Sequence, residues 1–249
     1  MHRYALTIEY DGSPFHGWQV QNNITTVQGV IFEAIKKFDV NCKNFIGAGR
    51  TDAGVHAIGQ VAHVDLATKH DCETVRRAIN YYLSKYPISI LSAVTVDEEF
   101  HARFSAKKRH YTYKIFSRKT DLTFERTQYW HVRHILNISN MEFAANYLIG
   151  KHDFSTFRSS ICQASSPVKT IDTINIQSEK IRDGIVYQLN FSARSFLHHQ
   201  VRSIVGCLEK VGCGKWAPEK TQEILLSKDR SKCAALAPSK GLYLTKIEY

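Results

Sequence analysis

The segment from Gly47 to Ala57 reads Gly-Ala-Gly-Arg-Thr-Asp-Ala-Gly-Val-His-Ala and is the most unusual stretch of the chain. Three of its first eight residues are glycines, which adopt backbone angles that other residues avoid, so we predict a tight loop. The loop presents Arg50 and Asp52, and charged groups on a loop over a rigid scaffold are often functional. A turn stabilised by a local Arg–Asp pair is the alternative interpretation, and these residues alone do not separate the two.

A metal site is a further interpretation of the same region. Asp52 and His56 lie four residues apart, and His63 and Asp65 follow on the next predicted strand. Imidazole and carboxylate groups bind Zn²⁺ or Mn²⁺. No His-Glu-x-x-His or comparable spacing is present, however, so this pattern is weak support for a metal.

Working outward from the loop, alternating and helical apolar patterns predict regular elements on both sides. In the first hundred residues the order is strand, helix, strand, strand, helix, strand. These elements are a strand Arg3–Tyr10, a helix around residues 27–38 capped by Thr25 or Thr26, a strand ending near Ile46, a strand Gln60–Asp65, a helix Glu73–Leu83 and a buried strand Ile88–Val96.

The rest of the chain repeats this order loosely. Its predicted elements are a strand His110–Ser117, a helix opened by the capping box Ser139-x-x-Glu142 and ending before Gly150, strands Ile171–Gln177 and Val186–Ala193, a helix His199–Val211, a helix from Pro218 to Leu226 and a strand Leu242–Glu248. We therefore predict a mixed α+β fold of two related halves, residues 1–104 and 105–249, with largely antiparallel sheets flanked by helices.

Positive charge suggests a polyanionic partner. The chain has 33 Lys and Arg against 23 Asp and Glu, a formal net charge of +10. Between His101 and Lys119 there are seven Lys or Arg, no acid and four interleaved aromatic residues. Cations bind phosphates and aromatic faces stack on unpaired bases, so this mixture suits RNA with splayed-out nucleotides. A solvated strand with a basic face is the alternative.

Composition narrows the class of protein. The hydrophobic share of 43% is typical of a globular chain, and Pro87–Val96, the longest nearly apolar run, is about half of the ~20 residues that a membrane span needs. The N-terminus leads straight into a strand pattern, so we expect no signal peptide. The six cysteines are scattered without a Cys-x-x-Cys pair, which predicts free thiols in a reducing cytoplasm.

The octapeptide from Gly49 to His56, Gly-Arg-Thr-Asp-Ala-Gly-Val-His, resembles the signature of the TruA-type tRNA pseudouridine synthases. Further segments resemble the same family in order along nearly the whole chain. They are Tyr10-Asp-Gly-Ser, Gly17-Trp-Gln with Gln21, Phe100–Ala106, Tyr111-x-Tyr113, Asp153-Phe-x-x-Phe157-Arg158, Phe196–Gly206 and Gly241-Leu-Tyr-Leu244.

This resemblance implies an isomerase that converts uridine to pseudouridine in the anticodon arm of tRNA, at positions 38, 39 and 40 of standard tRNA numbering. The reaction breaks the C1′–N1 bond, turns the base and forms a bond through C5. The resemblance implies that this reaction needs no cofactor and no metal. A cytoplasmic homodimer, with an active-site cleft between the two halves, is the expected form.

The resemblance also assigns roles to individual residues. Asp52 is the catalytic carboxylate, Tyr111 contacts the target base, and Arg202 is the basic residue of the active site. Arg50 inserts where the target base has left the stack, with a phosphate clamp as the alternative. A carboxylate suits this chemistry because breaking a glycosidic bond develops positive charge on the sugar.

Other basic residues are candidates for RNA contacts as a group: Arg103, Lys107, Lys108, Arg109, Arg158 and His199. His199, with His198, contacts RNA or serves the start of its helix, and we favour the structural role. Two rival functions remain open at this point. One is a non-catalytic tRNA-binding protein derived from such an enzyme, and the other is a metal-dependent nucleic-acid hydrolase.

Overall fold

The computed structural model describes all 249 residues, which divide into two compact units. Unit 1 consists of residues 1–107 and 243–249, and unit 2 of residues 108–242. The predicted ranges, 1–104 and 105–249, differ from these units chiefly in the last strand. That strand packs in unit 1 because it forms a parallel ladder there.

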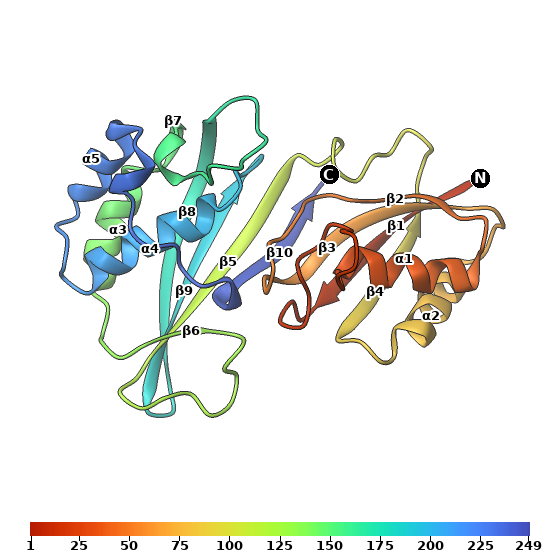
Figure 1. Ribbon diagram of the computed structural model, residues 1–249, viewed down its shortest axis with the longest axis horizontal. Helices are drawn as coiled ribbons and strands as arrows, with labels where there is room; N and C mark the ends of the chain where they lie inside the picture. The colour runs from red at the N-terminus through yellow and green to blue at the C-terminus, as the bar shows by residue number, and fades with distance from the viewer. The chain divides into compact units, whose positions relative to one another are not determined.

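Unit 1 is a mostly antiparallel sheet with two helices (Figure 1). Its strands run in the order β4-β1-β3-β10, and β2 also pairs with β3. Only β10 is parallel to its neighbour β3. The elements are β1 (His2–Tyr10), α1 (Val27–Phe38), β2 (Lys43–Gly47), β3 (His56–Leu66), α2 (Cys72–Leu83), β4 (Ile88–Thr95) and β10 (Leu242–Glu248). The predicted order of the first hundred residues is confirmed.

Both helices of unit 1 begin at capped positions. Thr26 Oγ1 accepts the backbone N–H of Gly29 at the start of α1, and Asp71 accepts that of Thr74 at the start of α2. Such caps satisfy N–H groups that have no partner within the helix. The apolar side of α1 is buried in the core of the unit, as its helical spacing predicted.

Unit 2 is an antiparallel sheet in the order β5-β9-β8-β7, with β6 parallel to β5. Figure 1 shows its three α-helices gathered on one side of this sheet. The elements are β5 (Lys108–Ser117), β6 (Trp130–Val132), α3 (Ile138–Asn146), β7 (Gly150–Asp153), the short 3₁₀ helix η1 (Ser155–Phe157), β8 (Val168–Ile181), β9 (Gly184–Ala193), α4 (Gln200–Gly212), α5 (Lys220–Ser227), and the 3₁₀ helices η2 (Arg230–Lys232) and η3 (Ser239–Gly241). Nearly every residue of α4 is buried, so it forms the centre of the helical layer.

Two local predictions are wrong. The strand Ile88–Val96 was expected to be buried, but β4 is an edge strand, and Leu91 and Val94 are exposed. The capping box at Ser139 does not form, because α3 begins earlier and the side chain of Asn137 accepts the N–H of Asn140. No helix of either unit combines the length and apolar character that crossing a bilayer requires.

Candidate active site

The loop between β2 and β3 carries Asp52, and β3 holds its first residues. The N–H of Ala48 donates to the carbonyl of Val61 at 2.7 Å. The buried amide of Gln60 donates to the carbonyl of Gly49 at 2.8 Å. The start of the loop is therefore fixed to the central strand of the sheet.

The segment that follows β1 holds the residue before Asp52. The N–H of Trp18 donates to the carbonyl of Thr51 at 3.0 Å. The hydroxyls of Thr51 and Tyr10 lie 2.8 Å apart in the buried core. Asp52 itself accepts the N–H of Val55 on its carbonyl at 3.1 Å. Hydrogen bonds therefore hold the backbone at Thr51 and at Asp52, and the carboxylate extends from this fixed segment.

Two glycines are required by this close packing. Gly17 has a φ of +89°, and a Cβ there would lie 2.7 Å from the carbonyl oxygen of Thr51. A Cβ on Gly47 would lie 2.6 Å from the indole ring of Trp18. The two glycines therefore permit the near contact that fixes the loop.

Arg50 and Asp52 lie on the same loop but differ in exposure. Asp52 is half-buried, whereas Arg50 is exposed. The Nε of Arg50 donates to the amide oxygen of Gln19 at 3.1 Å. Gln19 was not predictable as this partner from the sequence, because only the fold brings the two segments together.

Three of the residues considered for a metal site, His56, His63 and Asp65, engage other groups of the protein. Gly12 donates its N–H to Nδ1 of His56, and Ala102 donates to Nδ1 of His63. Asp65 accepts two hydrogen bonds from Arg3, whose guanidinium holds the pKa of that carboxyl below its usual value. Desolvation by burial lowers the pKa of His63 to about 4. These contacts explain the residues as structural groups of unit 1.

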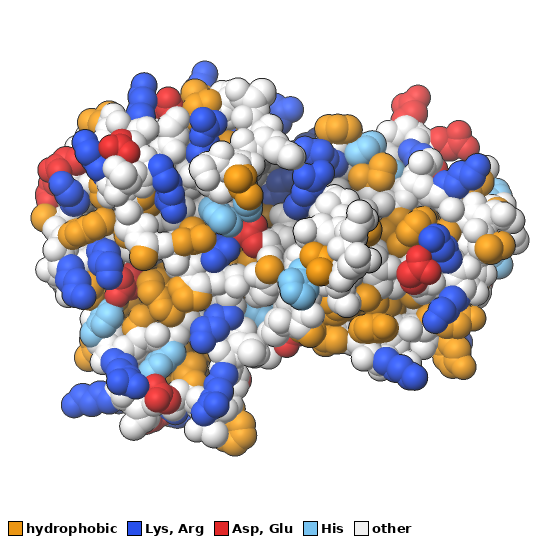
Figure 2. Space-filling model, in the orientation of Figure 1, with side chains coloured by type: hydrophobic (Ala, Val, Ile, Leu, Met, Phe, Trp, Pro, Cys, Tyr) orange, Lys and Arg blue, Asp and Glu red, His pale blue; other side chains and the backbone are white.

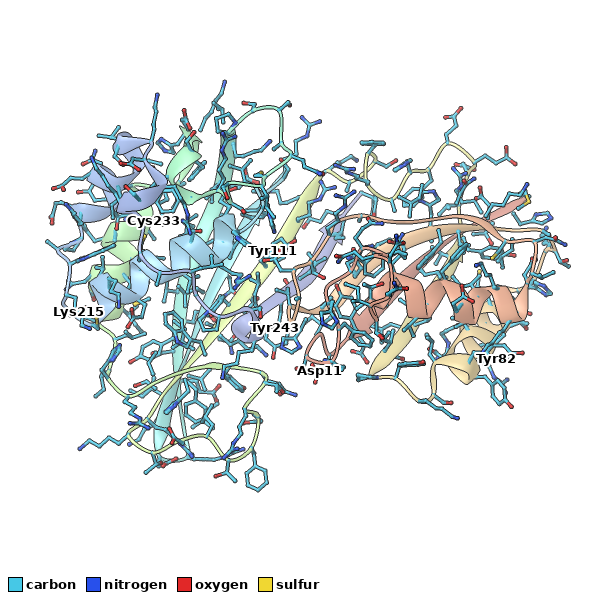
Figure 3. All side chains as sticks on the ribbon, in the orientation of Figure 1. Asp11, Tyr82, Tyr111, Lys215, Cys233 and Tyr243 are labelled. Atoms are coloured by element: carbon cyan, nitrogen blue, oxygen red, sulfur yellow. The ribbon has the colours of Figure 1, made fainter.

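In unit 2, Tyr111 lies on β5 (Figure 3) and is half-buried. Its ring meets that of Phe196 edge-on, with centroids 5.3 Å apart and planes at 89°. Phe196 is itself half-buried and supports the Tyr111 ring. No signal in the sequence pairs these two residues, which are far apart along the chain.

Tyr113, two residues further along β5, is a core residue. Its side chain is fully buried, and its hydroxyl donates to the carbonyl of Pro238 at 2.7 Å. Burial raises the pKa of Tyr113 well above its usual value, so its hydroxyl stays protonated at neutral pH.

Arg202 lies in the first turn of α4 and is half-buried. Its Nε donates to the carbonyl of Ala237 at 2.8 Å, and the N–H of Ala237 donates back to the carbonyl of Arg202 at 3.3 Å. This reciprocal pair fixes the stem of the guanidinium group. Planar guanidinium groups held in this way present a directed positive charge.

The residue that caps α4 has an unusual backbone. His199 is the N-cap of the helix, with a φ of 68°, and its side chain makes no capping hydrogen bond. The rings of His198 and His199 lie 4.0 Å apart. His199 therefore serves the helix start through its backbone conformation.

The candidate phosphate-binding residues are divided between the units. Arg103 and Lys107 are exposed in unit 1, whereas Lys108, Arg109 and Arg158 are half-buried in unit 2. Lys108 forms an ion pair with Asp172 at 3.0 Å, and Arg109 donates to a backbone carbonyl. Figure 2 shows Lys and Arg side chains distributed over the visible face of unit 2.

Comparisons with known proteins identify the family. A family model described as tRNA pseudouridine synthase matches residues 6–105 and 144–249. The chain is 51% identical to the tRNA pseudouridine synthase A of Parvibaculum lavamentivorans and 49% identical to that of Xanthobacter autotrophicus, each over 249 residues and 100% of both chains. It is 49% identical to that of Maricaulis maris over 100% of this chain and 98% of the relative. The matched ranges include the loop of Asp52 and the helix of Arg202, and the chain belongs to the tRNA pseudouridine synthase family of isomerases.

Proposed function

We propose that this protein converts uridine to pseudouridine at positions 38, 39 and 40 in the anticodon stem-loop of tRNA. The observation that carries the proposal is the placement of Asp52 on a loop anchored to β3 and to the segment after β1. Membership of the family, and relatives named tRNA pseudouridine synthase A, support it.

Asp52 is the proposed catalytic carboxylate. Cleavage of the C1′–N1 bond develops positive charge on the ribose, and a fixed carboxylate stabilises or attacks such a centre. Because the detached base is recaptured through C5, no water needs to be activated and one acid is sufficient. An anchored backbone favours this chemistry, since groups that are already oriented need no rearrangement during the reaction.

Tyr111 and Arg202 are proposed to act on the same uridine as Asp52. The edge-on contact with Phe196 orients the Tyr111 ring, which can stack on uracil and whose hydroxyl can exchange a proton at C5. Arg202, whose stem is held by Ala237, supplies the positive charge of the proposed active site.

The remaining basic residues are proposed to bind and deform the RNA. Arg50 is exposed, and its planar guanidinium is suited to fill the gap that an extruded base leaves. The group proposed to contact phosphates consists of Arg103, Lys107, Lys108, Arg109 and Arg158, with His199 near the helix start. A homodimer in the cytoplasm, acting without metal or cofactor, completes the proposal.

The experiment that tests this function measures tritium release from tRNA labelled at C5 of uridine. Formation of the C5 bond must expel that hydrogen, so the unmodified protein should release tritium in the presence of EDTA. Asp52→Ala should lower the rate by about 10³-fold or more while tRNA affinity stays near that of the unmodified protein.

Asp97→Ala is a matched control, because Asp97 is an exposed aspartate of the same unit. It should retain the full rate. Substantial turnover by Asp52→Ala would falsify the catalytic assignment. Intact tRNA binding without release by the unmodified protein would instead favour the non-catalytic tRNA-binding function.

A further inference from the structure

Two cysteines of unit 2 are in direct contact. The sulfur atoms of Cys207 and Cys233 lie 3.6 Å apart, although 26 residues separate them in the sequence. Cys207 is in α4 and fully buried, whereas Cys233 follows η2 and is only partly buried. Figure 3 places Cys233 beside α4. All six cysteines are reduced in this structure, so the pair is a contact between two thiols.

We propose that Cys207 and Cys233 form an oxidative modification site whose co-substrate is a hydroperoxide. The Cys233 thiolate attacks the peroxide, the O–O bond breaks, and a sulfenic acid and a hydroxide or alkoxide are formed. The Cys207 thiol then attacks the sulfenic sulfur, an S–S bond forms, and water leaves with the thiol proton. The two thiols supply the two electrons that reduce the peroxide.

The surroundings of the pair set the order of these steps. A hydrogen bond from Cys207 lowers the pKa of Cys233, and the guanidinium of Arg230 adds to this effect. The contact with Cys233 and burial both raise the pKa of Cys207. Thiolates are the nucleophiles in peroxide reduction. The partly exposed Cys233 is therefore the attacking residue, and the buried Cys207 closes the disulfide.

The segment of residues 229–238 lies along α4 and connects this pair to the rest of the helix. Arg230 donates to the hydroxyl of Ser203 at 3.0 Å and to the carbonyl of Thr156 at 3.2 Å. The carbonyl oxygen of Ala235 would lie 2.2 Å from a Cβ on Gly206. The segment is thus already as close to the helix as a glycine permits.

The same segment ends at the carbonyl that holds Arg202. A disulfide brings its two sulfur atoms to about 2.05 Å, closer than the 3.6 Å of the reduced pair. The segment must then shift against α4, and Ala237 moves with it because the two are continuous. Since Ala237 fixes Nε of Arg202, oxidation displaces the guanidinium. Small displacements of positioned groups cost large factors in rate.

The effect of oxidation on activity rests on the proposed function of Arg202, whereas formation of the disulfide is independent of that function. Peroxide treatment of the reduced full-length protein, followed by alkylation and non-reducing peptide mass mapping, should yield a linked peptide containing Cys207 and Cys233. The rate of tritium release should fall by about 10-fold and return after addition of dithiothreitol.

Two serine variants make the test specific. Cys233→Ser should keep the basal rate and lose both the linked peptide and the sensitivity to peroxide. Cys213→Ser is the matched control, because Cys213 is a partly exposed cysteine at the end of the same helix, and it should respond like the unmodified protein.

Absence of the linked peptide after peroxide treatment overturns the modification site. A linked peptide with an unchanged rate overturns the coupling to Arg202. If peroxide lowers the rate of Cys233→Ser as much as that of the unmodified protein, the effect arises at another residue, and the coupling to Arg202 is again overturned. Because the peptide is detected by mass, these outcomes are distinct from a failure of the isomerase assay itself.

Discussion

At the scale of single residues, His63 shows how burial sets a protonation state. Its side chain is 1% exposed, and Nδ1 accepts the N–H of Ala102, which requires the unprotonated atom. Burial is the main cause of its lowered pKa, Arg3 and His101 add to it, and Asp65 opposes it. His63 is therefore a neutral structural residue at physiological pH.

Because His63 is neutral in the folded protein, the free energy of unfolding should depend on pH. The folded pKa of about 4 lies below the unfolded value of about 6.5, so the unfolded chain binds the proton first. The contribution of His63 is complete above pH ~6.5 and is lost as the pH falls toward ~4, by about 3 kcal/mol. Urea unfolding of the unmodified protein and of His63→Gln should show it. Parallel pH profiles for the two proteins would contradict this account.

Residue roles were predictable only where the sequence itself carries the signal. The glycine pattern predicted a tight loop at Asp52, and Gly54 in that loop has a φ of +74°. The contacts of Phe196 with Tyr111 and of Ala237 with Arg202 were not predictable. They join segments distant in the sequence, and no local pattern encodes such pairs.

At the scale of elements, long periodic segments were predicted well and short ones were missed. The helices α1 and α2 and the strands β1 and β10 agree closely with their predicted ranges, because each repeats its pattern several times. β6 and β7 have only three and four residues, too few for an alternation to be recognised. β4 was assigned correctly as a strand but not as an edge, since burial depends on strand order.

The hydrogen bond that caps the start of α3 can be tested by substitution. Asn137→Ala removes the side chain that accepts the N–H of Asn140, and it should cost about 1 kcal/mol in the free energy of unfolding. Ser139→Ala lies inside the first turn and should cost less than about 0.5 kcal/mol. Urea denaturation of both variants measures the difference. A larger cost for Ser139→Ala would reinstate the predicted capping box.

At the scale of the whole molecule, the net charge of +10 predicts how tRNA binding responds to salt. Phosphate contacts release counterions, so affinity should fall at least about 10-fold between roughly 50 and 200 mM salt. Lys107→Gln should reduce the slope of log affinity against log salt by about 1. Lys36→Gln is the control, since Lys36 is paired with Glu33 on α1. Filter binding at several salt concentrations measures both slopes, and a flat dependence for the unmodified protein argues against phosphate-dominated binding.

The return of the last strand to unit 1 has a consequence for biosynthesis. A ribosome that has released residues 1–107 has made most of unit 1, but the parallel partner of β3 is still more than 130 residues away. Unit 2 is continuous in sequence and is synthesised entirely within that interval. Domains generally fold as units as they emerge during synthesis. The nascent chain therefore carries the edge of β3 without β10 throughout the synthesis of unit 2, and the unit bearing Asp52 is completed last.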